Sequence, residues 1–146
     1  MKIPKIVFSK WIRWPDRRKI RNSNQPGVYL IAIFKNLPPK KANLLDKEII
    51  YVGETCGNTP RGRKLTKRWC DFNRSALTGK KGHSGGQRCR GICRTQFSNM
   101  YVTAFPVPIS EMKEQMVRNS FIRYVERRII WGYTYKYNRL PYCNTK

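Results

Sequence analysis

Acidic residues are scarce in this chain. Among 146 residues there are 8 Asp and Glu against 31 Lys and Arg, so the formal net charge is +23 at pH 7. Such a field drives association with polyanions. We therefore expect nucleic acid as the leading partner. An anionic membrane surface is less favoured, because the basic residues are scattered along the chain.

Long hydrophobic runs are also missing. No segment reaches the ~20 apolar residues that a membrane span requires. The first fourteen residues are interrupted by Lys2, Pro4, Lys5, Lys10 and Arg13, so they lack the apolar core of a signal peptide. These absences predict a cytoplasmic, intracellular protein that does not enter membranes.

Histidine occurs once, at position 83, and the five cysteines are an odd number. An odd count favours reduced thiols over a disulfide framework. Cys89 and Cys93 are four residues apart, but a structural zinc site needs two further ligands. The remaining candidates have no paired spacing: they are Cys56, Cys70, Cys143 and His83. The sequence therefore does not favour a zinc site.

The length fits one domain. We assign residues 1–25 to a basic N-terminal arm and residues 26–146 to the domain proper. Trp11 and Trp14 lie among the basic residues of the arm. Aromatic rings in such a setting either stack on bases or cover the edge of a core.

Three segments have the composition of β-strands. Residues 27–34 are apolar nearly throughout, which indicates a strand that is covered on both faces. Residues 48–53 and 100–107 are the other two, and residues 54–58 are expected to be a polar turn. A hairpin of the first two strands brings Tyr29 and Tyr51 together, each near a glycine that leaves room for close approach.

Two segments have helical periodicity. Thr59 and Pro60 are suitable for a helix start, and apolar residues then recur at helical spacing as far as Ala76, with Arg68 at the border of the buried stripe.

A second helix is expected from a cap at Ser110 to about residue 130. Its apolar face includes Ile122, Val125 and Ile129, which leaves Glu126 partly buried. Such a carboxylate needs either a salt bridge or a metal ion, and residues 131–146 are expected to be a tail.

Residues 79–99 are the least regular part, because glycines at 79, 82, 85 and 86 disfavour a helix. This segment is predicted either to be a mobile basic loop that orders on DNA or to pack through Cys89, Ile92 and Cys93. The residues expected to contact DNA are Lys64, Lys67, Lys80, Lys81, His83, Arg88, Arg90 and Arg94.

The pattern resembles the GIY-YIG nuclease superfamily. Gly27-Val28-Tyr29 and Tyr51-Val52-Gly53 stand in the order of the two name motifs, with Val in place of Ile, and Arg68, Glu126 and Asn144 follow downstream. The resemblance covers about residues 26–146. It implies an α/β fold of the α+β sandwich type, with a small, mainly antiparallel three-stranded sheet flanked by helices.

The same resemblance implies a divalent-metal-dependent DNA endonuclease of restriction, phage or repair type. Tyr29 would act on the water, Arg68 would contact the phosphate, Glu126 would hold Mg²⁺ or Mn²⁺, and Asn144 would brace the site. Tyr51 belongs to the same catalytic set, DNA is the expected partner, and no small-molecule cofactor is expected. Asn138 is the alternative to Asn144. Phe72 stands where several members have a histidine, and His83 is the substitute that this chain offers. A non-catalytic nucleic-acid-binding module on the same fold is the alternative function, and the chain is expected to be a monomer or a homodimer.

Overall fold

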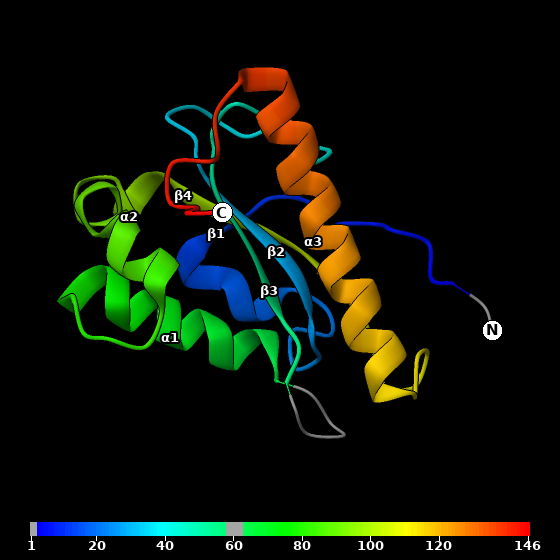
Figure 1. Ribbon diagram of the computed structural model, residues 1–146. Coiled ribbons are helices and arrows are strands. Elements are labelled where there is room, and N and C mark those ends of the chain that lie inside the picture. The colour runs from blue at the N-terminus through cyan, green and yellow to red at the C-terminus, as the bar shows by residue number, and fades with distance from the viewer. Residues whose placement is uncertain (1–2, 58–62) are drawn as a thin grey trace.

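The computed structural model describes residues 3–57 and 63–146. An antiparallel sheet of four strands, in the order β1-β4-β2-β3, lies between helices on its two faces (Figure 1). The strands are β1 (Ile12–Arg13), β2 (Gly27–Ile33), β3 (Ile49–Thr55) and β4 (Met100–Pro106). The predicted α+β class is confirmed. The fourth strand was not predicted, because β1 is only two residues long and is defined by its pairing with Tyr101 and Val102 of β4.

Strand β2 is the centre of the sheet and is buried along its whole length. It pairs with β3 on one side and with β4 on the other, which confirms the predicted hairpin. Its side chains alternate between two cores. Tyr29 and Ile31 belong to the core under α1 and α2, whereas Val28 and Leu30 belong to the core under α3. An apolar run with no polar alternation is what a strand covered on both faces requires.

Helix α1 (Leu65–Thr78) places Leu65, Trp69 and Phe72 on the first of these cores. The predicted start at Thr59 and Pro60 lies outside the described residues, and Lys64 precedes the helix with extended backbone. The helix ends where Gly79 adopts a left-handed conformation with φ of 75°, a conformation that glycine accepts without a steric penalty.

Helix α2 (Ser84–Thr95) corrects the prediction of an irregular segment at residues 79–99. It packs against α1 as a second helix of the same layer (Figure 1). The glycines in its first turn serve packing: a Cβ on Gly86 would lie 2.6 Å from the carbonyl oxygen of Phe72. Cys89 and Cys93 are buried and Ile92 packs against the same core, which confirms the alternative that the segment packs through these residues.

Helix α3 (Gln115–Tyr137) crosses the opposite face of the sheet (Figure 1). The predicted start at Ser110 was wrong. The guanidinium of buried Arg118 donates to the carbonyl oxygens of Met112 and Lys113, so these carbonyls are bound by a side chain before the helix begins. The predicted tail at residue 131 was also wrong, because the helix continues to Tyr137 and stops where Asn138 has φ of 52°.

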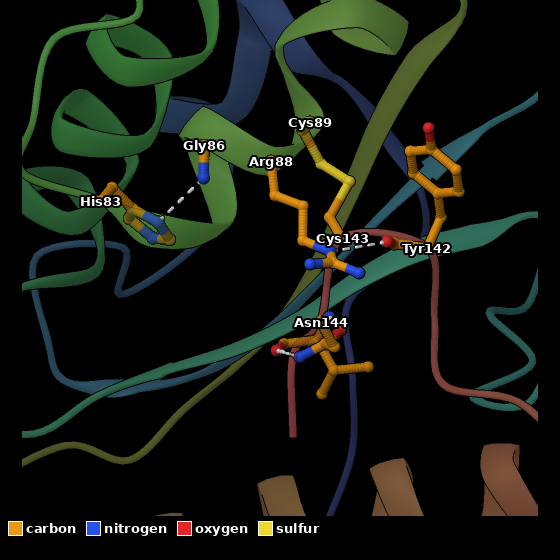
Figure 2. Close-up of a disulfide and its surroundings, with 8 residues drawn as sticks. His83, Gly86, Arg88, Cys89, Tyr142, Cys143 and Asn144 are labelled. Atoms are coloured by element: carbon orange, nitrogen blue, oxygen red, sulfur yellow. Dashed lines mark hydrogen bonds between the residues drawn. A yellow bond between two sulfur atoms is a disulfide. The ribbon is translucent and has the colours of Figure 1, made fainter.

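The C-terminal segment returns to the sheet and covers the edge of β3. The amide nitrogen of Cys143 donates to the carbonyl oxygen of Ile50 at 2.8 Å, and a disulfide joins Cys143 to Cys89 of α2 (Figure 2). This pair corrects the prediction of five reduced thiols, although Cys56, Cys70 and Cys93 are free. The two cysteines are 54 residues apart in sequence, so their pairing depends on tertiary structure.

The segment before β2 packs on the sheet. Trp14 is fully buried in one core and Trp11 is buried in the other. Of the two roles considered for these rings, the structure therefore shows the packing role. No helix in the described part of the chain has the length and apolar character needed to cross a membrane.

Candidate active site

Tyr29 and Tyr51 meet on the face of the sheet under α1 and α2. Tyr29 is paired with Gly53 across the hairpin, and the two tyrosine rings lie 5.9 Å apart. A Cβ on Gly53 would lie 2.6 Å from Tyr29 Cζ and 2.6 Å from Tyr51 Cε1. The prediction that glycine makes room for the two rings is therefore confirmed for Gly53.

His83 is packed inside this aromatic group. It caps α2, where the amide nitrogen of Gly86 donates to Nδ1 at 3.1 Å (Figure 2). The other ring nitrogen, Nε2, lies 2.9 Å from Tyr29 Oη. Since Nδ1 accepts a hydrogen bond, the neutral imidazole carries its proton on Nε2 and donates it to Tyr29. The His83 ring also lies 5.1 Å from the ring of Phe72, so it adjoins the position where the resemblance expected a histidine.

These groups are neutral at pH 7. Burial, followed by the charge of Arg68, lowers the pKa of His83 to about 3. Burial raises the pKa of Tyr29 well above its usual value and that of Tyr51 to about 12, although the charge of Arg68 opposes the change at both phenols. The surroundings of Tyr29 and Tyr51 therefore do not favour loss of the phenol proton at pH 7.

Arg68 stands at the border of the buried stripe of α1, as predicted, and is half-buried. Its charge acts on Tyr29, Tyr51 and His83 together. None of these three groups is charged at pH 7, so none of them neutralises the guanidinium, which is a suitable donor for phosphate oxygens.

Two carboxylates lie on the other face of the sheet. Glu126 of α3 is 17% exposed, and its ion pair with Arg127 has a separation of 4.0 Å. Glu54 of β3 has a buried Oε2 with no hydrogen-bond partner among the described residues. Burial, followed by the charge of Glu54, raises the pKa of Glu126 to about 7, against the opposing charges of Arg127 and Arg123. The partial burial predicted for Glu126 is confirmed.

A cavity of about 460 Å³ opens where the two faces meet at the edge of β3. Its walls come from β3, the start of α2, α3 and the C-terminal segment, and the residues on them are Tyr51, Glu54, Ser84, Gly85, Arg123, Glu126, Arg127 and 143–146. Tyr51 faces this cavity. Tyr29 is fully buried behind it.

The carboxylates of this cavity fit a magnesium ion. Mg²⁺ prefers oxygen ligands and is commonly held by one or two carboxylates together with water and substrate phosphates. Glu54 and Glu126 supply two: the buried Oε2 of Glu54 has no hydrogen-bond partner among the described residues, and burial, followed by the charge of Glu54, raises the pKa of Glu126. A bound cation would offset both the burial and the like charge. In the described part of the chain, no three His, Cys, Asp or Glu side chains group as a metal site.

Asn144 fixes the edge of β3 next to Tyr51. Its side-chain amide donates to the carbonyl oxygen of Val52 and accepts from the Val52 amide, both at 2.9 Å (Figure 2). The side chain thus satisfies both backbone groups that an edge strand leaves unpaired. Asn138 is exposed at the end of α3, so of the two predicted asparagines only Asn144 contacts the site.

The lysines and arginines predicted to contact DNA are exposed: they are Lys64, Lys67, Lys80, Lys81, Arg88, Arg90 and Arg94. Two of them have partners, since Lys67 pairs with Asp71 at 2.9 Å and Arg88 donates to the carbonyl oxygen of Tyr142. His83 differs, because it is 1% exposed. Its burial removes it from direct contact with DNA and places it among the groups behind the cavity.

Sequence reasoning missed Glu54, Arg123 and Arg127. Glu54 was assigned to a turn, whereas β3 extends to Thr55. Had the strand been extended by two residues, its alternation would have placed Glu54 on the face of Val52, beside Glu126. The arginines precede and follow Glu126 at helical positions on the cavity side, and nothing in the sequence distinguishes them from the other basic residues.

Comparisons with family models, curated proteins and solved structures found no match for this chain. The resemblance to the GIY-YIG nucleases therefore stays a prediction from the residues.

Proposed function

We propose that this protein is a divalent-metal-dependent endonuclease that hydrolyses phosphodiester bonds in DNA. One observation carries the proposal: Tyr51, Asn144 and Glu126 adjoin one cavity, and the charge of Arg68 acts on the same tyrosine. These residues lie far apart in sequence. Three of the residues that carry the resemblance thus line one cavity, whereas Tyr29 is buried and Arg68 is not on the cavity wall.

Glu126 and Glu54 would hold the ion. When bound, a divalent cation supplies charge relief at the phosphate and makes water a stronger nucleophile at neutral pH. The cavity residues then have separate tasks. Arg68 binds phosphate oxygens and stabilises the charge that grows on them, while Arg123 and Arg127 attract the phosphate backbone to the mouth of the cavity.

The hydroxyl of Tyr51 is the tyrosine group that meets the substrate. His83 donates to Tyr29 Oη, so Tyr29 keeps its own proton for the Tyr51 hydroxyl, with which its side chain interacts. Tyr51 then directs its proton into the cavity, where it donates to a phosphate oxygen or orients the water. This assignment differs from the resemblance, in which the first tyrosine acts on the water.

The test is cleavage of plasmid DNA with Mg²⁺ and with EDTA. Wild-type protein should cut only with Mg²⁺. Glu126→Gln should cut at least about 10³-fold more slowly, because it removes the ligand charge while keeping the shape. Its DNA affinity should stay within about twofold, since one carboxylate contributes little beside the phosphate contacts.

Glu114→Gln is the matched control, because Glu114 is exposed and makes no side-chain capping bond at the start of the same helix. This variant should cut as the wild type does. If wild-type protein binds DNA but leaves it intact under all metal conditions, the chain is the non-catalytic nucleic-acid-binding module instead.

A further inference from the structure

The outer face of α3 carries a stripe of exposed aromatic and basic side chains that the cleavage site does not use. Tyr124, Arg128, Trp131 and Tyr135 follow one another at steps of four, three and four residues. At 3.6 residues per turn, these positions fall on one face of the helix. We call these four residues the aromatic stripe.

The rings of the aromatic stripe are open to solvent. Trp131 is 68% exposed, Tyr135 is 81% exposed and Tyr124 is 54% exposed. Trp131 and Tyr135 stack on each other with centroids 5.5 Å apart and planes 20° apart. Rings of this size are normally buried in a core or an interface, so three on one helix face indicate a surface with a partner.

The charged residues that α3 itself carries next to the stripe are basic. Arg128 lies within it, with Nη1 3.5 Å from Tyr124 Oη, and Lys136 and Arg139 are exposed close by. The single acidic residue of α3, Glu126, lines the cleavage cavity instead. A second copy of this chain would bring another charge of +23 to the same surface, which opposes self-association.

We propose that the aromatic stripe is a stacking platform for single-stranded DNA. Every base offers a π-face to an exposed ring, and the phosphates of the same strand match Arg128 and its basic neighbours. The eleven helical steps from Tyr124 to Tyr135 span about 16 Å, the length of four or five stacked nucleotides at about 3.4 Å each. Trp131 also borders an apolar groove of about 400 Å³ that includes Leu45 and Ile129, where the edge of a stacked base can be buried.

The inference rests on the proposed function and adds one point to it, namely that the DNA substrate contains unpaired nucleotides. The test measures binding alone, so its result does not depend on whether the protein cleaves DNA. Trp11, Trp14 and Trp69 are buried, so a change in tryptophan fluorescence when an oligonucleotide stacks reports mainly on Trp131.

The experiment titrates the full-length protein into a short dye-labelled oligo(dT), a labelled oligo(U) of the same length and a labelled DNA duplex. Each Kd is obtained from the fluorescence anisotropy of the dye, so variants without Trp131 are measured in the same way, and tryptophan fluorescence is recorded separately with unlabelled strands. Wild-type fluorescence should be quenched by oligo(dT). Trp131→Ala should raise the Kd for oligo(dT) at least about fivefold and should leave the Kd for the duplex unchanged. Trp131→Phe should retain most of the affinity. Met116→Ala is the matched control, because Met116 is exposed on the same helix but off the stripe, and it should bind as the wild type does.

Salt dependence separates stacking from charge. Trp131→Ala should keep the wild-type slope of log K against log salt, whereas Arg128→Ala should reduce the slope by about 0.7. Glu126→Gln should give the wild-type quench, so loss of cleavage and loss of stacking are read independently. Tighter binding of oligo(U) than of oligo(dT) would reassign the platform to RNA.

Three results would overturn the inference. The first is unchanged oligo(dT) affinity in Trp131→Ala, and the second is an equal loss of affinity for the duplex. The third is a wild-type dimer by analytical ultracentrifugation that Trp131→Ala converts to a monomer, because the stripe would then bind a second copy of the chain.

Discussion

The two faces of the sheet bury polar groups of different kinds. The face under α1 and α2 encloses Tyr29 and His83, which are neutral and bonded to each other. The face under α3 carries Glu54 and Glu126, which adjoin an open cavity. The two arrangements meet at the edge of β3, where Tyr51 lines the same cavity.

This difference follows from the free energy of burial. A neutral polar group can be enclosed at modest cost when it is hydrogen-bonded, whereas a carboxylate needs water, a cation or a proton. The aromatic face can therefore be rigid and dry, and the charged face must remain accessible. We therefore propose that the first face positions Tyr51 and contributes Arg68 to phosphate binding, and that the second face holds the metal ion.

Arg68 is expected to show the largest effect after Glu126, because in the proposed mechanism its guanidinium stabilises the charge that grows on the phosphate. Arg68→Ala should slow cleavage about 10²-fold, close to 3 kcal/mol at the transition state. DNA affinity should fall only a few-fold, since one phosphate contact among many is lost. Single-turnover rates and binding isotherms on the same duplex measure the two. Equal losses would make Arg68 one more member of the basic surface.

His83 should make stability depend on pH. Its pKa is about 3 in the folded protein and 6.5 in the unfolded chain. Below pH 6.5 the imidazole therefore binds a proton in the unfolded chain but not in the folded protein. Stability contributed by neutral His83 is therefore present above pH 6.5 and is lost as the pH falls toward 3. Between pH 7 and pH 5 the loss should be about 2 kcal/mol.

Urea unfolding of wild type and His83→Gln at both pH values measures this contribution. Glu126 acts in the opposite direction, because its raised pKa of about 7 lets the folded protein take up the proton first as the pH falls. That contribution is common to both proteins and cancels in their difference. The same pH dependence in wild type and variant would show that His83 is not held neutral.

Tyr51 and Tyr29 give the closest comparison between the cavity and the enclosed interior behind it, because the same substitution is made at neighbouring rings, of which only Tyr51 lines the cavity. Tyr51→Phe should slow cleavage about tenfold, or 1.4 kcal/mol, since it removes the hydroxyl that lines the cavity. Tyr29→Phe should mainly lower stability, because it leaves the Nε2 proton of His83 without its acceptor. Thermal melts measure the loss of stability in each variant, and cleavage assays measure the loss of rate. A larger loss of cleavage rate in Tyr29→Phe than in Tyr51→Phe would show that the hydroxyl of Tyr29 is the one that acts on the substrate.

Strong periodic signals made much of the fold predictable. The apolar run of β2 predicted a strand covered on both faces, and the spacing around Arg68 and Glu126 placed both at the border of a core. Helix α2 was not predictable, because Gly85 and Gly86 weaken helix propensity in isolation but are required where the helix approaches the Tyr51 ring and the backbone of α1. Tertiary packing outweighed propensity there.

Contacts between distant segments explain what the sequence did not reveal about the site. His83 reaches Tyr29 only because α2 packs on α1, and Cys89 meets Cys143 only because the C-terminal segment returns to β3. Glu54 was missed for a local reason, since the end of a strand is its least predictable point.

The most direct test of the central claim is Mn²⁺ binding to the purified protein, measured by electron paramagnetic resonance without DNA. A trace of contaminating nuclease cannot affect this measurement, whereas it can affect a cleavage assay. Wild type and Glu114→Gln should each bind one Mn²⁺ per chain, Glu54→Gln should bind it more weakly, and Glu126→Gln should lose the site. Undiminished Mn²⁺ binding by Glu126→Gln would contradict the assignment of the metal, and with it the proposed mechanism, to the cavity at the edge of β3.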